Sequence, residues 1–453
     1  MRLLAAHAVL ALLPLSANAE ITMELMHTKP ECAQPGKTST WCTAEDTDKA
    51  TKDSGMVARI NSILEKFAIA KAKAGASPKV HIAYFSFSNK LVHEKLCEVG
   101  KLGIPMTIVL DNGSKGQADK VAACQKDPQK PNVKVSYLGG VRQPWRLHHN
   151  KFLVVDPGDG TDFSINFSSG NLSTYGTSLH LDHWVVATAP ANSNLTRSHL
   201  CVIKGLDEAV KTADETGMYA TGEADSKFDR QVVNAYIDTR GACFTKTGVI
   251  PTMESDKALE AEGIAPSYSP NKKNEVLKVF IRELERVTAR QNAGEEMYIY
   301  IAIQHFLHRD VKAALVNAAN AGVDVRLVMD DDVARGESEV PGVSKFYREE
   351  LRGKGMEIRF AQTNAGARQM MHNKLAILSG ERTFSGAGHY TTAAMKNNWE
   401  NFYLVQNRKL VREYTTYFKE LWEKSLDETG ATGGVISAPE ALHPKALELI
   451  GTP

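Results

Sequence analysis

Two short motifs carry the residue types that could act on a phosphate ester. The first is His149-Asn-Lys151 and the second is His372-Asn-Lys374, and each opens a short apolar run. Residues two apart in a strand point to the same face, so the His and Lys of each motif are expected to face one cavity. Two imidazoles and two ammonium groups suit an anionic phosphodiester, with one His attacking phosphorus and the other protonating the leaving oxygen.

The motifs lie within a longer repeat. Each is followed, at one constant offset between the copies, by two polar residues: Asn171 and Asp182 in the first copy, and His389 and Glu400 in the second. Upstream, residues 80–111 match residues 298–330 in the order of an apolar strand, a mixed helix and a second strand that ends in Asp. A period this long is not that of a solenoid. We therefore expect a duplicated domain whose two halves close over one shared site.

This arrangement resembles the phospholipase D superfamily, whose members carry two His-x-Lys-x4-Asp motifs. The resemblance covers roughly residues 80–404. The first motif is complete through Asp156 and is followed by a Ser-x-Asn element at Ser169 and Asn171. Residues 391–401 resemble the branch that contains small bacterial endonucleases and related phospholipase D-like enzymes.

The second copy departs from the family pattern at two positions. Ser379 stands where the motif Asp is expected, and His389 stands opposite Asn171. In the family the Asp is mainly a structural partner, so its loss need not abolish the chemistry. A His can donate a hydrogen bond to a phosphate oxygen as an Asn does. Both His and both Lys are present, which favours an active enzyme.

The resemblance implies a role for each candidate residue. His149 would attack phosphorus to form a phosphohistidine, and His372 would protonate the leaving alcohol and then activate water. Lys151 and Lys374 would neutralise the non-bridging oxygens. Asn171 and His389 would donate further hydrogen bonds, Glu400 would pair with His149 and Asp182 with His372, and Ser169 would contact substrate. Apart from the resemblance, Trp145 is a candidate substrate contact that lines the cleft, with packing as the alternative. The protein supplies the positive charge, so we expect no metal and no other cofactor.

The alternation of strands and helices predicts an α/β sandwich with two pseudo-symmetric halves. We expect a signal peptide at 1–19, an N-terminal half at 20–220, a connector at 221–273, a C-terminal half at 274–430 and a tail at 431–453. Residues 20–50 are polar and are expected to form a loop. Residues 244–273 contain Pro251, Pro266 and Pro270 and are expected to be rich in loops.

The N-terminus has the composition of a targeting segment. Arg2, an apolar run at 3–15 and the sequence Ala17-Asn-Ala19 predict a signal peptide cleaved before Glu20. The apolar run is short for a bilayer span, and no other segment is long enough. We expect a secreted or periplasmic protein without a membrane segment after cleavage. One chain supplies both motifs, so a monomer suffices for a complete site.

All six cysteines precede residue 245. An even number behind an export signal favours disulfides. Sequence neighbours are predicted to pair, as Cys32–Cys42, Cys97–Cys124 and Cys201–Cys243, among the other connectivities that six cysteines allow. A zinc site is the competing interpretation, but the cysteines lack the clustered spacing of zinc ligands.

Three functions stay open from the sequence. The first is an exported enzyme that cleaves a phospholipid phosphodiester, with or without transfer to an alcohol. The second is an exported, metal-independent endonuclease; residues 391–400 favour it, whereas the formal net charge of +1 favours lipid, because nucleic-acid binding usually needs a basic surface. The third is a catalytically weakened phosphate-binding protein, which Ser379 and His389 would permit.

Overall fold

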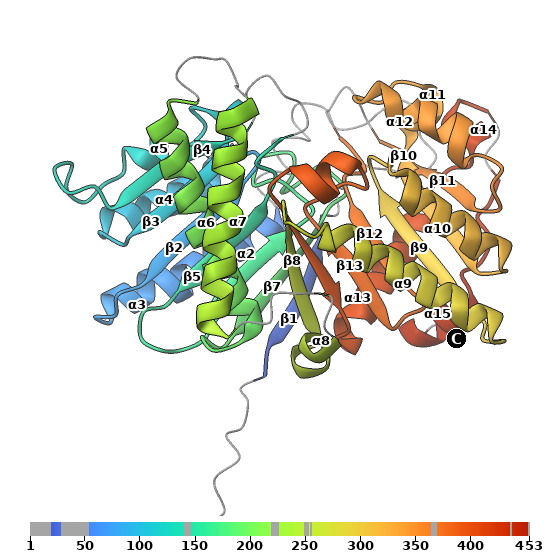
Figure 1. Ribbon diagram of the computed structural model, residues 1–453, viewed down its shortest axis with the longest axis horizontal. Coiled ribbons are helices and arrows are strands. Elements are labelled where there is room, and N and C mark those ends of the chain that lie inside the picture. The colour runs from blue at the N-terminus through green and yellow to red at the C-terminus, as the bar shows by residue number, and fades with distance from the viewer. Residues whose placement is uncertain are drawn as a thin grey trace, which may run out of the picture.

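A computed structural model describes most of the chain. The described residues are 20–28, 54–139, 146–218, 226–248, 253, 256–363, 369–434 and 437–451. The predictions for the signal peptide, for the Cys32–Cys42 pair and for Trp145 lie outside these residues. Figure 1 shows two sheets, the N-terminal one in blue and green and the C-terminal one in yellow to red.

The first sheet has seven strands and mixes parallel and antiparallel pairs. Their order is β1 (Thr22–His27), β7 (His183–Ala189), β6 (Phe163–Ser168), β5 (Lys151–Asp156), β2 (Lys79–Tyr84), β3 (Met106–Asp111) and β4 (Val133–Leu138). β2, β3 and β4 run parallel to one another, and the other neighbours pair antiparallel. Parallel strands need helical crossovers, which here include α4 (Lys90–Lys101) and α5 (Asp119–Ala122).

The second sheet repeats the first strand for strand. Its order is β8 (Ile264–Ser269), β14 (Glu400–Val405), β13 (Arg382–Gly386), β12 (Lys374–Leu378), β9 (Tyr298–Ile303), β10 (Asp324–Asp330) and β11 (Glu357–Ala361). The parallel strands are again three, β9, β10 and β11. The prediction of a duplicated α/β fold is therefore confirmed, because the second half reproduces both the strand order and the direction of each pair.

Helices flank both sheets. The other helical segments of the first half and its junction are α2 (Gly55–Ile63), η1 (Leu64–Ile69), α3 (Ala70–Lys73), η2 (Asn112–Ser114), α6 (Asn194–Thr216), α7 (Ser226–Thr247) and α8 (Asp256–Glu262). Those of the second half are α9 (Glu275–Asn292), α10 (Arg309–Asn320), α11 (Asp331–Arg335), α12 (Pro341–Phe346), η3 (Tyr347–Leu351), η5 (Ala393–Asn397), α13 (Arg408–Glu423), α14 (Glu428–Ala431) and α15 (Pro444–Ile450). Within the described residues, no helix is both long and apolar enough to span a bilayer.

Two segments that the sequence predicted as loops contain strands. Residues 22–27 form β1, which pairs antiparallel with β7, and residues 264–269 form β8, which pairs antiparallel with β14. Both are edge strands, which take part in only one ladder and so carry a weak sequence signal. Pro266 was taken as a loop residue, but an edge strand tolerates proline because one side of its backbone is unpaired.

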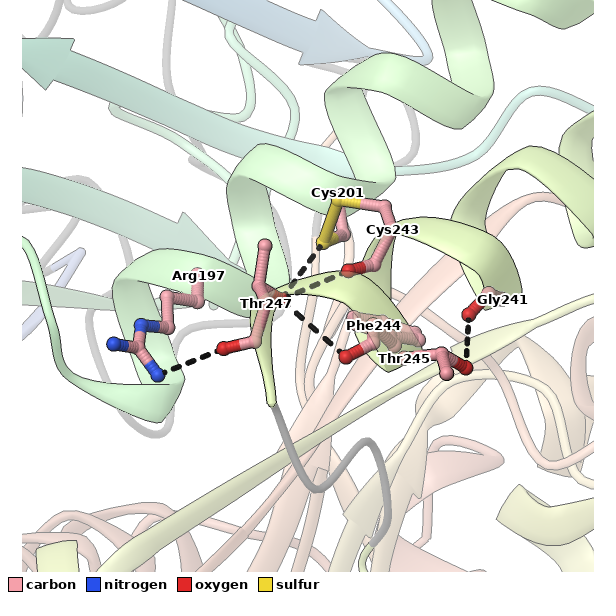
Figure 2. Close-up of a disulfide and its surroundings, with 7 residues drawn as sticks. All are labelled: Arg197, Cys201, Gly241, Cys243, Phe244, Thr245 and Thr247. Carbon is pink, nitrogen blue, oxygen red and sulfur yellow. Dashed lines mark hydrogen bonds between the residues drawn. A yellow bond between two sulfur atoms is a disulfide. The ribbon is translucent and has the colours of Figure 1, made fainter.

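The segment predicted as a connector contains helices α7 and α8 besides β8. α6 and α7 lie against each other in front of the first sheet in Figure 1. The predicted Cys201–Cys243 disulfide joins these two helices, and nearby the Arg197 side chain on α6 donates to the carbonyl of Thr247 at the end of α7 over 3.0 Å (Figure 2). The predicted Cys97–Cys124 disulfide is also present.

One hydrophobic core spans both halves. It includes side chains from β5, β6 and β7 of the first sheet together with side chains from β9, β12 and β14 of the second. At its centre the rings of Phe167 and Tyr403 stack with centroids 3.8 Å apart. The predicted tail also packs onto the second half, where the backbone N–H of His443 donates to the Tyr300 hydroxyl over 2.6 Å. The two halves are therefore held together by a shared apolar interior.

Candidate active site

Each motif begins a central strand and is hydrogen-bonded to the other half. The His149 N–H donates to the carbonyl of Trp399 over 2.8 Å, and the His372 N–H donates to the carbonyl of Leu181 over 3.1 Å. Trp399 and Leu181 each lie one residue before an acidic residue, Glu400 or Asp182. The shared core and these bridges bring the start of β5 next to the start of β14, and the start of β12 next to the start of β7.

The two imidazoles are paired with carboxylates across the halves. Nδ1 of His149 lies 2.7 Å from Oε2 of Glu400, and Nδ1 of His372 lies 3.0 Å from Oδ1 of Asp182. Both carboxylates are fully buried. The cross-pairs implied by the resemblance are therefore present, and each carboxylate can fix the ring orientation of an imidazole that belongs to the opposite half.

Both motif lysines are buried beside the histidines. Nζ of Lys151 donates to Nε2 of His149 over 2.8 Å, and Nζ of Lys374 donates to the carbonyls of His372 and, over 3.3 Å, of Ser169. Burial lowers the pKa of Lys151 to about 7, although Glu400 and Asp182 oppose the change. Burial also lowers the pKa of Lys374 well below its usual value. An anion entering the site would stabilise both ammonium groups.

The two carboxyl groups are in opposite electrostatic situations. Burial raises the pKa of Asp182, but His372 and Lys374 outweigh it and hold that pKa below its usual value. Burial raises the pKa of Glu400 to about 8, although Lys151 opposes this. The Ser169 hydroxyl, predicted to contact substrate, donates to Oδ1 of Asp182 over 2.7 Å. Its local partner thus helps to keep Asp182 ionised.

Asn171 and His389 complete the set of predicted polar residues. The His389 ring lies between the two motif histidines, with centroids 5.5 Å from His149 and 5.6 Å from His372. Nδ1 of His389 and Oδ1 of Asn171 are buried and have no hydrogen-bond partner among the described residues. Gly170 lets the Asn171 loop approach Asp182, because a Cβ there would lie 3.0 Å from the carboxylate carbon.

The sequence interpretation missed three side chains around these groups. The ring of His305 stacks on His389 at 4.4 Å, and the ring of His180 lies 5.3 Å from His372. Phe85 lies 5.0 Å from the His149 ring and 5.7 Å from the Lys151 ammonium. Phe85 directly follows β2 and His305 lies two residues after the end of β9; β2 and β9 are the strands beside the motif strands. The order of the strands in the sheets places Phe85 and His305 near the motifs, whereas the spacing of these residues in the sequence does not indicate it.

The far ends of the motif strands differ without touching the site. Oδ1 of Asp156 accepts the N–H of Gly158 over 2.8 Å, and Ser379 adopts a left-handed conformation with its N–H donating to Tyr298. Both residues lie five positions beyond the motif lysine, about 17 Å away along the strand. The Asp-to-Ser difference therefore changes a turn and leaves the imidazoles and ammonium groups unaffected.

Among the described residues, one group has the spacing of metal ligands. His180, Asp182 and His372 place ligand atoms within 4.8 Å of one another. However, Asp182 already accepts from Ser169 and is paired with Nδ1 of His372. A metal ion would have to displace the imidazole–carboxylate bond, so this arrangement favours a hydrogen-bonded pair.

Comparisons with known proteins agree with this architecture. Residues 291–422 match the family model described as cardiolipin synthase, PLD-like domain. The chain is 28% identical over 146 residues to mitochondrial cardiolipin hydrolase of Danio rerio, covering 32% of this chain and 58% of that protein. It is 29% identical over 107 residues to phospholipase D of Rickettsia prowazekii, covering 23% of this chain and 45% of that protein.

These matches support the phospholipase D superfamily that the two motifs indicated. The chain spans about half the length of the curated relatives that it matches. The crystal structure of phosphatidylserine synthase from Haemophilus influenzae shares its fold, with a TM-score of 0.51 and 11% identity over 82% of this chain and 85% of that one. Both halves of the phospholipase D-like chain therefore have a counterpart in one solved structure.

Proposed function

We propose that this protein is an exported phosphodiesterase that hydrolyses phospholipids through a phosphohistidine intermediate. The observation that carries the proposal is the pairing of two buried imidazoles with carboxylates of the opposite half, beside two buried lysines. The names of the relatives, cardiolipin hydrolase and phospholipase D, support a phospholipid as the substrate class.

In the proposed first step, Nε2 of His149 attacks phosphorus. A P–N bond forms, the P–O bond to the leaving alcohol breaks, and His372 gives its proton to that oxygen. In the second step His372 takes a proton from water, the water oxygen attacks phosphorus, and the P–N bond breaks to release phosphatidic acid. An alcohol in place of water would give transphosphatidylation.

The electrostatics support this division of roles. Burial lowers the pKa of His372, and the ionised Asp182 beside it opposes this change, so Asp182 favours the imidazolium form that a general acid requires. His149 has its Nδ1 directed at Glu400 and its Nε2 directed at Lys151, so Nε2 faces the ammonium that would bind a phosphate oxygen. Lys151, Lys374 and His389 are then placed to stabilise the charge that grows on the non-bridging oxygens.

Export is supported by the N-terminal leader pattern and by the two disulfides, which form in oxidising compartments. N-terminal sequencing of protein recovered from the periplasm or medium tests it. A mature chain that begins at Glu20 is expected, and an uncleaved chain in the cytoplasm would contradict export.

The test of the activity uses purified mature protein and a His149→Ala control. Both are incubated with phosphatidylcholine vesicles, cardiolipin vesicles, and single- and double-stranded DNA. Phosphatidic acid or phosphatidylglycerol release by the wild type alone is expected. Cleavage of DNA but not of lipid would favour the endonuclease, and no cleavage of either would favour the phosphate-binding protein.

A further inference from the structure

A carboxylate contact is repeated behind the two motif histidines. Asp111 is the last residue of β3, and its Oδ2 accepts the N–H of His148 over 2.9 Å. Asp330 is the last residue of β10, and its Oδ2 accepts the N–H of Met371 over 2.6 Å. His148 and Met371 each directly precede a motif histidine, so one contact recurs at equivalent positions of both halves.

The second oxygen of each carboxylate holds a turn. Oδ1 of Asp111 accepts the N–H of Gly113 over 2.8 Å, and Oδ1 of Asp330 accepts the N–H of Asp332 over 3.1 Å. Asp111 and Asp330 are 1% and 2% exposed. Asp330 therefore caps α11 and also contacts the motif segment.

His148 is completely buried. Its backbone is held on two sides, by Asp111 and through a bridge to Trp399. Met371 is likewise held by Asp330 and through a bridge to Leu181. Each motif histidine thus follows a residue fixed by a carboxylate of its own half and by the backbone of the other half.

We propose that Asp111 and Asp330 are positioning residues, Asp111 for the His149 imidazole and Asp330 for the His372 imidazole. The inference rests on the proposed function for its catalytic consequence. Removing either carboxylate leaves a buried N–H without an acceptor one residue before the histidine, so this backbone must move to find another partner. A displacement of about 1 Å at a reacting group lowers the rate about 100-fold.

The test uses the different roles proposed for the two histidines, nucleophile for His149 and general acid for His372. A p-nitrophenyl phosphodiester has a leaving group that departs without a proton, whereas the choline of phosphatidylcholine requires one. In the first turnover on the p-nitrophenyl ester, Asp111→Ala is expected to slow the burst of p-nitrophenol about 100-fold, and Asp330→Ala to leave it within about 5-fold of wild type. On phosphatidylcholine both variants are expected to be slowed about 100-fold.

Three further variants control for a general structural effect. Asn keeps one acceptor oxygen, so Asp111→Asn and Asp330→Asn should recover part of the loss in their alanine variants. Asp427→Ala removes a carboxylate that caps α14 without a recorded contact to either motif, and it should change neither rate. Equal burst rates for Asp111→Ala and Asp330→Ala, or no recovery with Asn, would overturn the inference.

A measurement independent of activity separates this inference from the proposed function. In ¹⁵N NMR spectra of the imidazoles, Asp111→Asn should shift the His149 signals more than those of His372, and Asp330→Asn should do the reverse. If the wild type cleaves no phosphodiester but the shifts follow this pattern, the function fails and the positioning role stands. If both variants disturb both histidines equally, the positioning role fails.

Discussion

The two half-sites are built on the same strands, yet they differ in their charged partners. His372 faces Asp182, whose pKa is held low by His372 and Lys374 and which also accepts from Ser169. His149 faces Glu400, whose pKa burial raises to about 8 and which accepts from Asn398 over 3.2 Å. Position 387, the counterpart of Ser169, is alanine. Duplication has kept the backbone, while side-chain differences shift the pKa values of the two carboxyl groups in opposite directions.

The largest effect should distinguish the two histidines. His149→Ala is expected to lose about 10⁴-fold or more in kcat on every phosphodiester, because no other group can form the intermediate. His372→Ala should lose about 10² to 10⁴-fold on alkyl esters and much less in the first turnover of a p-nitrophenyl ester. Phosphorus-labelled substrate should leave label on denatured His372→Ala protein and none on His149→Ala. The reverse labelling would exchange the roles of the two halves.

The carboxylates should differ in both activity and stability. Asp182→Asn and Glu400→Gln are each expected to lower kcat about 100-fold, because an amide orients the imidazole wrongly. A depressed pKa stabilises the fold above the unfolded value, so Asp182→Asn should lower Tm at pH 8. A raised pKa means that the contribution of Glu400 to stability falls as pH rises from about 4.5 to about 8, so Glu400→Gln should gain Tm relative to wild type over that range.

Thermal unfolding from pH 5 to pH 9 measures this difference. Parallel changes of Tm with pH in the two variants would show that the pKa values of both carboxyl groups are shifted in the same direction. The two half-sites would then not differ electrostatically.

The titration of Lys151 is expected to have a smaller effect on activity. The pKa of Lys151 is lowered to about 7, so its ammonium is lost as pH rises through 7, and kcat/KM of the wild type should fall on the alkaline side. Lys151→Arg should be about 10-fold slower near pH 7, but its alkaline decline should move to higher pH because a guanidinium stays charged. The measurement is the pH profile of kcat/KM. An unchanged alkaline limb would assign it to another group.

The difference at His389 should have a modest effect. His389→Asn restores the residue type of the first half and keeps a hydrogen-bond donor, so kcat/KM is expected to stay within about 10-fold of wild type. His389→Ala should lose more, because its donor disappears. The measurement is kcat/KM of both variants and of the wild type on one phosphodiester. Equal losses in the two variants would show that His389 acts by packing against His305.

The disulfides should affect stability and leave kinetics unchanged. Cys97–Cys124 lies in the first half, and Cys201–Cys243 joins α6 to α7 and closes a separation of 42 residues. The Cys201→Ser/Cys243→Ser double variant is expected to lose about 2 to 4 kcal/mol of unfolding free energy while keeping kcat/KM. Denaturant unfolding with and without reductant measures it. A large loss of kcat/KM under native conditions would mean that the α6–α7 pair controls the site.

The sequence by itself determined the two His–Lys pairs, the duplication and two disulfides. These signals are local or periodic: a strand period of two puts His149 and Lys151 on one face, and a constant offset relates Asp182 to Glu400. Only the tertiary structure revealed the edge strands β1 and β8, the carboxylates behind the motifs and the ring of His305. The opposite pKa shifts of Asp182 and Glu400 also depend on it, because desolvation and cross-half contacts arise only when residues far apart in the chain are buried together.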